Sequence, residues 1–256
     1  MIELGNEVAS VMVDVVNGAR LASVRVLGHE LLVEGAPESM NWGCYPMAPW
    51  AGRTRHGRFR FAGRQYRLPI NFAPHAIHGT VYDRSWRQVD DGVFETALGE
   101  SWPFPGLVRQ SIHLSEDGLR LGLEVHGGPM PAVCGWHPWF RRRLGDSEVR
   151  IEFDSTAMFE RGPDSIPTGR LVGRPPGPWD DCFEWDGRAR LRWPGTLDLE
   201  IESDCRYLVV FDEKPHAVCV EPQTAPPDAL NGGAALVEPG RPLVATTIWR
   251  WSGTAS

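Results

Sequence analysis

Residues 11–26 read VMVDVVNGARLASVRV, and this stretch decides the fold class. Two apolar-rich runs, residues 11–16 and 21–26, stand on either side of Asn17-Gly18. Asn-Gly is favoured in two-residue β-hairpin turns, because both positions tolerate a positive φ. The stretch therefore predicts an antiparallel hairpin closed by a two-residue turn.

Similar strand patterns recur along the chain, separated by turn signals. They lie at residues 59–68 around Ala62-Gly63, at 107–114 and 119–125 around Glu116-Asp117-Gly118, and at 197–202, 207–211 and 244–251. No stretch combines a sustained 3.6-residue period with helix caps. The pattern predicts an all-β protein, built as a sandwich or barrel.

The length of 256 residues suits one large all-β domain or two small ones. The most irregular stretch is residues 161–178, which contain five of the prolines. The strand patterns on both sides are alike in kind, so we predict a long functional loop there. Residues 1–256 are accordingly predicted to form a single domain.

The charge pattern limits the classes of partner. The formal net charge is −7, and no basic face is evident, which argues against a nucleic-acid partner. Arginines cluster at residues 53–67 and 141–143, where aromatic and acidic neighbours indicate solvated strand faces; a phosphate-bearing ligand is the alternative. No run approaches the roughly 18 apolar residues of a membrane span, and the acidic N-terminus lacks a signal-peptide core. We expect a soluble cytoplasmic protein without a membrane partner; its oligomeric state stays open.

The cysteines are odd in number, widely spaced and without a CxxC pair. This pattern predicts reduced, buried thiols and disfavours both a disulfide framework and a zinc site. The five residues are Cys44, Cys134, Cys182, Cys205 and Cys219.

Glu221 is the first candidate for chemistry. It ends the apolar run of residues 217–220 and precedes a Pro-rich turn that carries Gln223 and Asn231. A carboxylate there is held by the strand yet faces what the loop encloses, as a catalytic base or a hydroxyl acceptor requires. The alternative is an ordinary loop acid at a strand end.

Two histidines stand out by their context. His78 precedes Gly79, which we expect to let a ligand approach, and His137 lies among Trp136, Trp139 and Phe140. In a strand at least one of these tryptophans should face the core while His137 faces the opposite way. Taken singly, a histidine in such a context is more often a structural residue.

Together these residue types suit either a sugar or a metal. A neutral sugar needs acids and imidazoles for its hydroxyls and flat apolar surface for its ring, which eleven tryptophans could supply. A cupin-like metal set could instead be drawn from His75, His78, His137 and Glu221. However, i, i+3 spacing on a strand puts His75 and His78 on opposite faces, and Pro74 disfavours a helix. We therefore expect no metal and no cofactor.

Five segments resemble, in order, the motifs of the aldose 1-epimerase (galactose mutarotase) family. They are PWAGRTRHGRF at 49–59, AIHG at 76–79, GWHPWF at 135–140, WDDCF at 179–183 and VCVEPQT at 218–224. The resemblance implies a large antiparallel β-sandwich. It also implies an isomerase that interconverts the α and β anomers of a free hexose or related aldose by ring opening. The alternatives are a hexose-6-phosphate 1-epimerase and a non-catalytic sugar-binding protein on the same fold.

The resemblance also implies roles for individual residues. Glu221 corresponds to the catalytic base and His137 to the catalytic acid, while Arg53, His78 and Asp180 correspond to substrate-binding positions. Asp181 is adjacent and competes with Asp180 for that role. At ordinary pKa values of about 4.3 and 6.5, Glu221 would be ionised and His137 partly protonated near neutral pH.

One departure from the family pattern affects Arg53. The family usually has Asn-Arg-Ile where this chain has Gly52-Arg53-Thr54. Loss of the Asn side chain puts in question how Arg53 is oriented and which sugar fits.

Overall fold

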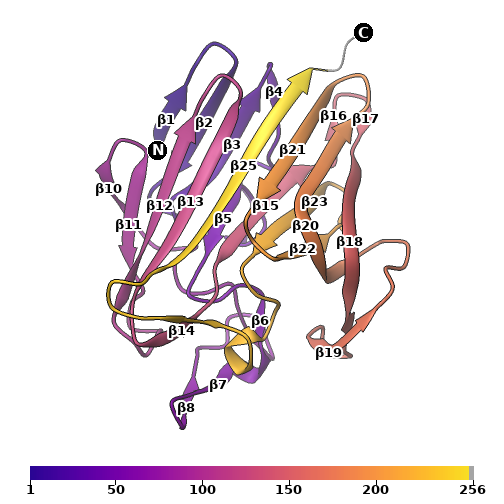
Figure 1. Ribbon diagram of the computed structural model, residues 1–256. Coiled ribbons are helices and arrows are strands. Elements are labelled where there is room, and N and C mark those ends of the chain that lie inside the picture. Colours follow the sequence, from indigo (N-terminus) through magenta and orange to yellow (C-terminus); the bar gives the residue numbers. More distant parts are fainter. Residues whose placement is uncertain (254–256) are drawn as a thin grey trace.

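The computed structural model describes residues 1–253, and almost every regular element in this range is a strand (Figure 1). The strands of the first half are β1 Ile2–Gly5, β2 Ala9–Asp14, β3 Arg20–Val26, β4 His29–Glu30, β5 Cys44–Met47, β6 Arg53–Thr54, β7 Arg58–Phe61, β8 Arg64–Arg67, β9 Ala76–Ile77, β10 Arg87–Asp90, β11 Val93–Ala97, β12 Gly106–Leu114 and β13 Gly118–Gly127. Those of the second half are β14 Met130–Ala132, β15 Gly135–Arg141, β16 Arg143–Leu144, β17 Ser147–Glu148, β18 Arg150–Arg161, β19 Pro167–Val172, β20 Asp180–Trp193, β21 Leu197–Ser203, β22 Tyr207–Phe211, β23 Ala217–Gln223, β24 Ala235–Val237 and β25 Leu243–Gly253. Two short 3₁₀ helices, η1 Arg55–Gly57 and η2 Ala229–Asn231, complete the set.

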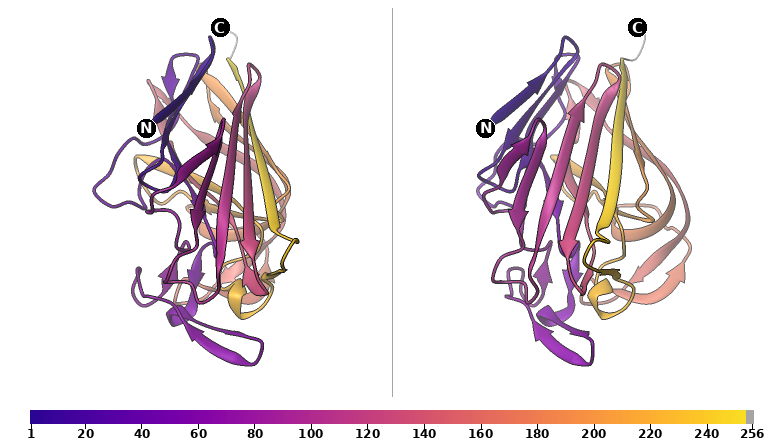
Figure 2. Two further views of the ribbon diagram at one scale, coloured as in Figure 1. Left: turned by 90° about the vertical axis from the view of Figure 1, so that its left-hand side faces the viewer. Right: turned by 60° about the vertical axis from the view of Figure 1, so that its left-hand side comes forward.

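One 17-stranded antiparallel sheet curls into two layers (Figures 1 and 2). The first layer runs β1–β2–β3–β5–β15–β23–β22–β20, and the second runs β20–β21–β25–β13–β12–β11–β10. Strand β20 belongs to both, because its first part pairs with β22 and its second part with β21. The prediction of a large antiparallel β-sandwich is confirmed.

Alternation along the strands builds the core between the layers. Val11 and Val13 of β2 are fully buried, as are Leu121 and Leu123 of β13. Trp136 of β15 belongs to the same cluster, and its indole Nε1 donates to Gln110 Oε1 at 3.1 Å. Side chains on successive strand residues point to opposite faces, so β15 presents its other side chains away from this core.

A second, smaller apolar cluster lies on that other face. It includes Tyr45 of β5, Trp139 of β15 and Cys219 of β23. Trp136 thus faces the main core, whereas His137 and Trp139 share the opposite face. This confirms the expected division between Trp136 and His137, and it leaves His137 among aromatic rings on the face that carries the loops.

The hairpin predicted at the start of the chain is confirmed, but the prediction of a two-residue turn is wrong. The pairing of β2 with β3 ends at Asp14 and Arg20, so five residues, 15–19, form the connection. The Asp14 carboxylate accepts hydrogen bonds from residues of this connection. The donors are the backbone N–H of Val16 at 3.1 Å and Asn17 Nδ2 at 2.8 Å. Such Asx capping favours a wider loop than Asn-Gly alone predicts.

The other predicted hairpins and strands are confirmed. In β7–β8 the turn is Ala62-Gly63, with φ values of 47° and 76°. The runs at 107–114 and 119–125 lie in β12 and β13, which pair directly, and β21, β22 and β25 include the remaining predicted strands. Residues 161–178 are less irregular than expected, because β19 within them pairs with β18.

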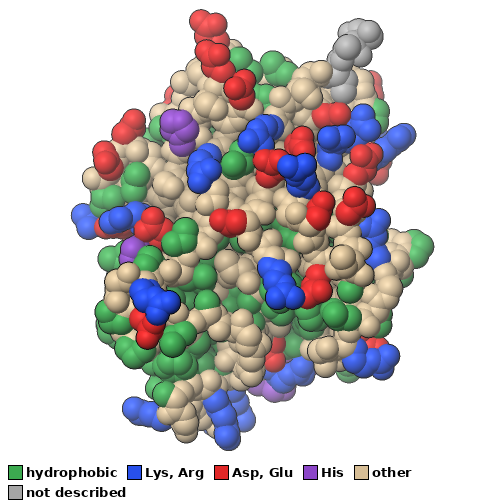
Figure 3. Space-filling view, viewed as in Figure 1, with side chains coloured by type: hydrophobic (Ala, Val, Ile, Leu, Met, Phe, Trp, Pro, Cys, Tyr) green, Lys and Arg blue, Asp and Glu red, His purple; other side chains and the backbone are tan. Residues whose placement is uncertain are grey.

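Surface arginines largely meet acidic partners. Figure 3 shows basic and acidic side chains interleaved where β21 and β25 lie in Figure 1. For example, Arg188 of β20 lies 3.2 Å from Glu202 of β21. In the run 141–143, Arg141 pairs with Glu34 at 3.0 Å and Arg143 with Glu148 at 2.8 Å. Arg141 and Arg143 therefore lie on a solvated face, as predicted, whereas Arg142 is only 18% exposed and donates to the backbone carbonyl of Lys214 at 2.9 Å. All five cysteines are free and buried, also as predicted.

Among residues 1–253, no helix has the length and apolar character that crossing a membrane requires.

Candidate active site

A row of side chains crosses five neighbouring strands on the loop-covered face of the first layer. His137 of β15 pairs with Tyr45 of β5, and Val209 of β22 pairs with both Glu221 of β23 and Cys182 of β20. His137 stands opposite Glu221, because the flanking pairs are Gly135 with Gln223 and Trp139 with Cys219. Antiparallel register thus brings together two residues that lie far apart in the sequence.

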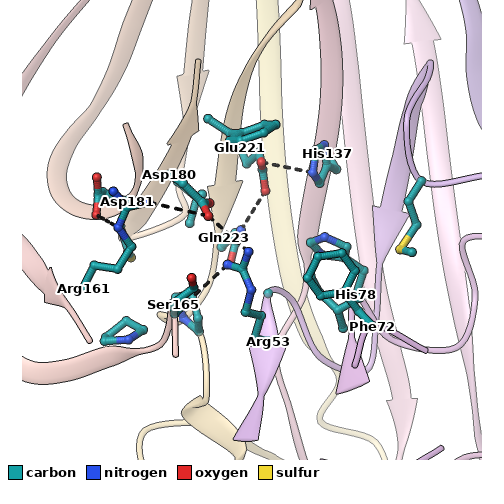
Figure 4. Close-up of a pocket in the computed structure, with 18 of the residues that line it drawn as sticks. Arg53, Phe72, His78, His137, Arg161, Ser165, Asp180, Asp181, Glu221 and Gln223 are labelled. Carbon is teal, nitrogen blue, oxygen red and sulfur yellow. Dashed lines mark hydrogen bonds and ion pairs between the residues drawn. The ribbon is translucent and has the colours of Figure 1, made fainter. Parts of the chain in front are cut away.

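The row forms the floor of a pocket of about 290 Å³. All five residues predicted from the sequence line it: Arg53, His78, His137, Asp180 and Glu221. Loops from β6, β9 and the β18–β19 turn supply the walls, as Figure 4 shows. The structure therefore brings the predicted residues together in one pocket.

Glu221 and His137 contact each other directly. His137 Nε2 lies 3.2 Å from Glu221 Oε1, and their side chains are only 7% and 3% exposed (Figure 4). The imidazole is stacked between two rings, with centroid distances of 4.9 Å to Tyr45 and 5.3 Å to Trp139. The aromatic stack fixes the ring plane, so Nε2 stays directed at the carboxyl group.

Burial shifts the pKa values of both members of this pair. It raises the pKa of Glu221 well above its ordinary value, and the nearby Asp180 carboxylate adds to the rise. Burial also lowers the pKa of His137 well below its ordinary value. A buried site disfavours two charges, so both shifts favour a neutral pair, in which the carboxyl proton of Glu221 faces the imidazole. Both directions are opposite to those that would favour an ionised Glu221 beside a partly protonated His137, and that expectation stays a prediction.

His78 reaches the pocket through an unusual backbone conformation. Its φ is 60°, a left-handed value that few non-glycine residues adopt and that recurs at functional sites. Its ring meets that of His137 edge-on at 4.9 Å, and its buried Nδ1 has no hydrogen-bond partner. Gly79 serves the backbone and not a ligand, contrary to expectation: a Cβ there would lie 1.9 Å from the carbonyl oxygen of Ala48.

Arg53 is oriented by contacts that do not depend on the residue before it. Its guanidinium donates to Asp180 Oδ2 at 3.1 Å and to the backbone carbonyl of Ser165 at 3.3 Å. Gly52 has a φ of 66°, and a Cβ there would lie 2.9 Å from Cγ of Pro227. Pro227 thus fills the space that an Asn side chain would need, while Asp180 holds the arginine.

Asp180 and Asp181 are distinguished by their partners. Asp180 bonds Arg53 beside Glu221, whereas Asp181 faces Arg161, with its Oδ1 3.3 Å from the guanidinium Nε (Figure 4). Arg161 also lies 3.8 Å from Asp180. Of the two acids, Asp180 is therefore the one placed next to the Glu221–His137 pair.

The cupin-like set does not assemble, because His75 turns away from the pocket. His75 Nδ1 accepts from the backbone N–H of His56 at 3.1 Å, and its Nε2 lies 3.1 Å from the carbonyl oxygen of Asp164. Within residues 1–253 the nearest approach to a metal site is His137, Cys219 and Glu221, whose ligand-type atoms lie within 4.8 Å of one another. Burial raises the pKa of the Cys219 thiol.

Several pocket residues were missed by the sequence reasoning. Tyr45 and Gln223 enter through strand register, which no single segment reveals. Phe72 lies at the rim, 45% exposed, with the guanidinium carbon of Arg53 5.5 Å from its ring centroid. For Gln223 the sequence offers only its position two residues after Glu221, which puts both side chains on one face of a strand but does not mark a function.

Comparison with known proteins places these observations in context. The sequence matches the family described as aldose 1-epimerase over residues 1–250. It is 35% identical to the uncharacterized protein YihR of Escherichia coli (strain K12), in an alignment that covers 88% of this chain and 85% of YihR. It is 26% identical to the uncharacterized protein YphB of the same organism, over 72% of this chain and 74% of YphB.

Solved structures show the same fold. A galactose mutarotase-like protein from Clostridium acetobutylicum superposes with a TM-score of 0.86 at 15% identity, covering 98% of this chain and 95% of that one. A galactose 1-epimerase from Lactobacillus acidophilus NCFM gives a TM-score of 0.79 at 16% identity, covering 99% and 94%. At such identities the likeness concerns the architecture.

Proposed function

The chain belongs to the aldose 1-epimerase family, and from that premise we propose that it interconverts the α and β anomers of a free aldose. The observation that carries the proposal is the buried contact of 3.2 Å between Glu221 and His137 on the pocket floor. A protein that only binds sugar has no need of an acid and a base that share one proton. The fold alone would not support this choice, because one fold serves many functions.

The shared proton gives the pair both catalytic roles. Transfer of the proton from Glu221 Oε1 to His137 Nε2 creates a carboxylate and an imidazolium in a single step. The Arg53 guanidinium favours the ionised carboxylate and so lowers the pKa of Glu221, opposing part of the burial effect. We propose that a bound sugar completes this shift by hydrogen bonding to the carboxylate as its charge develops.

Ring opening then needs only these two groups. Glu221 takes the proton of the C1 hydroxyl while His137 gives its proton to the ring oxygen, and the ring C1–O bond breaks. The open-chain aldehyde rotates about C1–C2, and the reversed steps close the ring on the other face. The number of protons on the enzyme is the same before and after, and no redox step occurs. Arg53, His78 and Asp180 are proposed to bind the sugar hydroxyls.

The charges of the pocket favour a neutral sugar. Arg53 is already paired with Asp180, and Arg161 is paired with Asp181 and with Glu213, which lies 3.4 Å away. A phosphate would have to displace one of these carboxylates. The remaining cation of the pocket lining is the exposed Lys214, and a phosphorylated hexose would depend on it.

A panel of sugars tests the proposal. Anomer exchange is followed by polarimetry or NMR with free aldoses and with their 6-phosphates, comparing wild type with Lys214→Ala. We expect exchange of at least one free aldose at a rate that Lys214→Ala leaves unchanged. Exchange confined to phosphorylated sugars and lost in Lys214→Ala would establish the phosphate alternative. Binding of sugars without exchange would establish a non-catalytic binding protein.

Chelation gives a second test, because the proposed steps use no metal. We expect full activity after exhaustive dialysis against a strong chelator. Elemental analysis should then find no stoichiometric transition metal. Activity that disappears on chelation and returns with an added metal would contradict the mechanism and direct attention to the trio of His137, Cys219 and Glu221.

A further inference from the structure

Gln223 has an unusual pattern of hydrogen bonds for a buried side chain. It is fully buried and lines the pocket beside Glu221. Its amide Nε2 donates to Glu221 Oε2 at 3.1 Å, whereas its carbonyl Oε1 has no hydrogen-bond partner (Figure 4). The nitrogen is the atom that faces Glu221, because two oxygen acceptors would repel each other.

A glycine on the neighbouring strand makes room for this arrangement. Gly135 pairs with Gln223 across β15 and β23. A Cβ at Gly135 would lie 2.3 Å from the carbonyl oxygen of Pro222 and 3.1 Å from Cγ of Gln223. Any larger residue at position 135 would therefore push the Gln223 side chain out of its place.

Gln110 shows what a structural buried glutamine looks like in the same protein. It is equally buried, but both ends of its amide are bonded: Nε2 donates to the carbonyl of Ala19 at 2.7 Å, and Oε1 accepts from Trp136 Nε1 at 3.1 Å. Leaving a buried carbonyl unsatisfied is costly. Gln223 is a lining residue of the pocket, so a bound ligand is the group available to satisfy its free Oε1.

We propose that Gln223 both positions Glu221 through its amide nitrogen and binds a sugar hydroxyl through its carbonyl oxygen. This inference rests on the proposed function, and it adds a substrate contact that the family motifs did not assign. Because Nε2 occupies Glu221 Oε2, the shared proton is confined to Oε1, the oxygen that faces His137. Gln223 thereby directs the proton onto the path along which it must move.

Other ionisable groups also face Glu221 and set the background for a test by pH. They are His137 on β15, Asp180 and Cys182 on β20, Arg53 on β6, Tyr45 on β5, and Cys219 on β23. None of these is changed by a substitution at position 223. A change in the pH profile of such a variant therefore reports the lost amide contact.

The test compares Gln223→Met with Gln110→Met, since Met preserves length and burial but offers no amide. Sugar affinity is measured by calorimetry and anomer exchange by NMR, using the free aldose that wild type exchanges fastest. We expect Gln223→Met to bind roughly 3- to 10-fold more weakly, the usual effect of one neutral hydrogen bond. The rate of anomer exchange should also fall off at a higher pH than in wild type. The reason is that the lost Gln223 amide had favoured the ionised form of the Glu221 carboxylate. Gln110→Met should change neither property, although it unfolds at a lower temperature.

Monodeoxy analogues of the same aldose supply a second, ligand-side measurement. One analogue should bind wild type more weakly than the parent sugar, yet bind Gln223→Met no more weakly than the parent does. Wild-type affinity and an unmoved pH limb in Gln223→Met would overturn the proposal. If Gln223→Met does not fold, a monodeoxy series in which every analogue binds wild type like the parent would overturn it instead. A wild type that binds sugar without exchanging anomers would refute the proposed function, while the affinity comparison would still decide the hydroxyl contact.

Discussion

Replacing Glu221 with Gln is expected to lower kcat for anomer exchange by roughly 10²- to 10⁴-fold, the usual contribution of a positioned general base. The substitution suits this site unusually well. The new amide oxygen can accept from Gln223 Nε2, and the new amide nitrogen can donate to His137 Nε2, so both present contacts have a replacement. Only the transferable proton is lost. Sugar affinity should therefore change little.

Glu95→Gln is the matched control for this experiment. Glu95 is also a buried carboxylate, but it lies outside the pocket and bonds Arg109 at 2.6 Å and Arg87 at 2.9 Å. Its substitution should lower stability and leave kcat unchanged. Equal rates of anomer exchange in Glu221→Gln and wild type would remove Glu221 from the role of base.

His137→Gln should abolish most of the rate and also change the shape of the pH profile. A Gln side chain can place its amide near the present position of Nε2, but it cannot carry the proton to the ring oxygen. We expect kcat to fall by a factor comparable to that of Glu221→Gln. Polarimetry across a wide pH range measures the rate and the profile together.

The directions of the two pKa shifts determine where the rate of the wild-type protein falls off at low pH and at high pH, the two limbs of its pH profile. The active pair holds one proton. On acidification it gains a second proton at His137, whose lowered pKa places this limb well below the ordinary histidine value of about 6.5. On alkalinisation it loses its single proton from Glu221, whose raised pKa places that limb well above about 4.3. Activity should therefore be level between these two limbs, which belong to the pair as a unit.

His78 provides the contrast for this prediction. It lines the pocket but is not in contact with the carboxyl group, and burial lowers its pKa well below the ordinary value. His78→Asn should raise the substrate concentration needed for half-maximal rate and keep both limbs. His137→Gln should lose the low-pH limb. If instead His78→Asn lost that limb while His137→Gln retained it, the two histidines would have to exchange roles.

Much of the fold could be predicted because strand alternation is local. The period-2 pattern at residues 197–202 and the turn at Ala62-Gly63 each depend only on neighbouring residues, and both are confirmed. The two-residue turn predicted at Asn17-Gly18 was wrong. A side chain outside the dipeptide, Asp14, accepts a hydrogen bond from the backbone N–H of Val16 and so favours a wider loop.

The site was predicted less completely because register and burial are long-range properties. Motif resemblance identified Glu221 and His137, but the pairing of β15 with β23 is what places them in contact. The same pairing puts Gln223 in the pocket wall, and no local pattern marks it as functional. The pKa shifts of the pair could not be predicted, because burial depends on the whole fold and ordinary pKa values apply to exposed groups.

The row across β5, β15, β23, β22 and β20 has a consequence for how relatives of this protein can diverge. Its reacting groups stand on paired strands at the centre of a sheet, where a substitution disturbs both faces. Arg53, Phe72 and Ser165 stand on surrounding loops and short edge segments, which tolerate change far better. Descendants of such a chain can therefore acquire new preferences among sugars by altering these walls, while the proton-transfer apparatus is inherited intact.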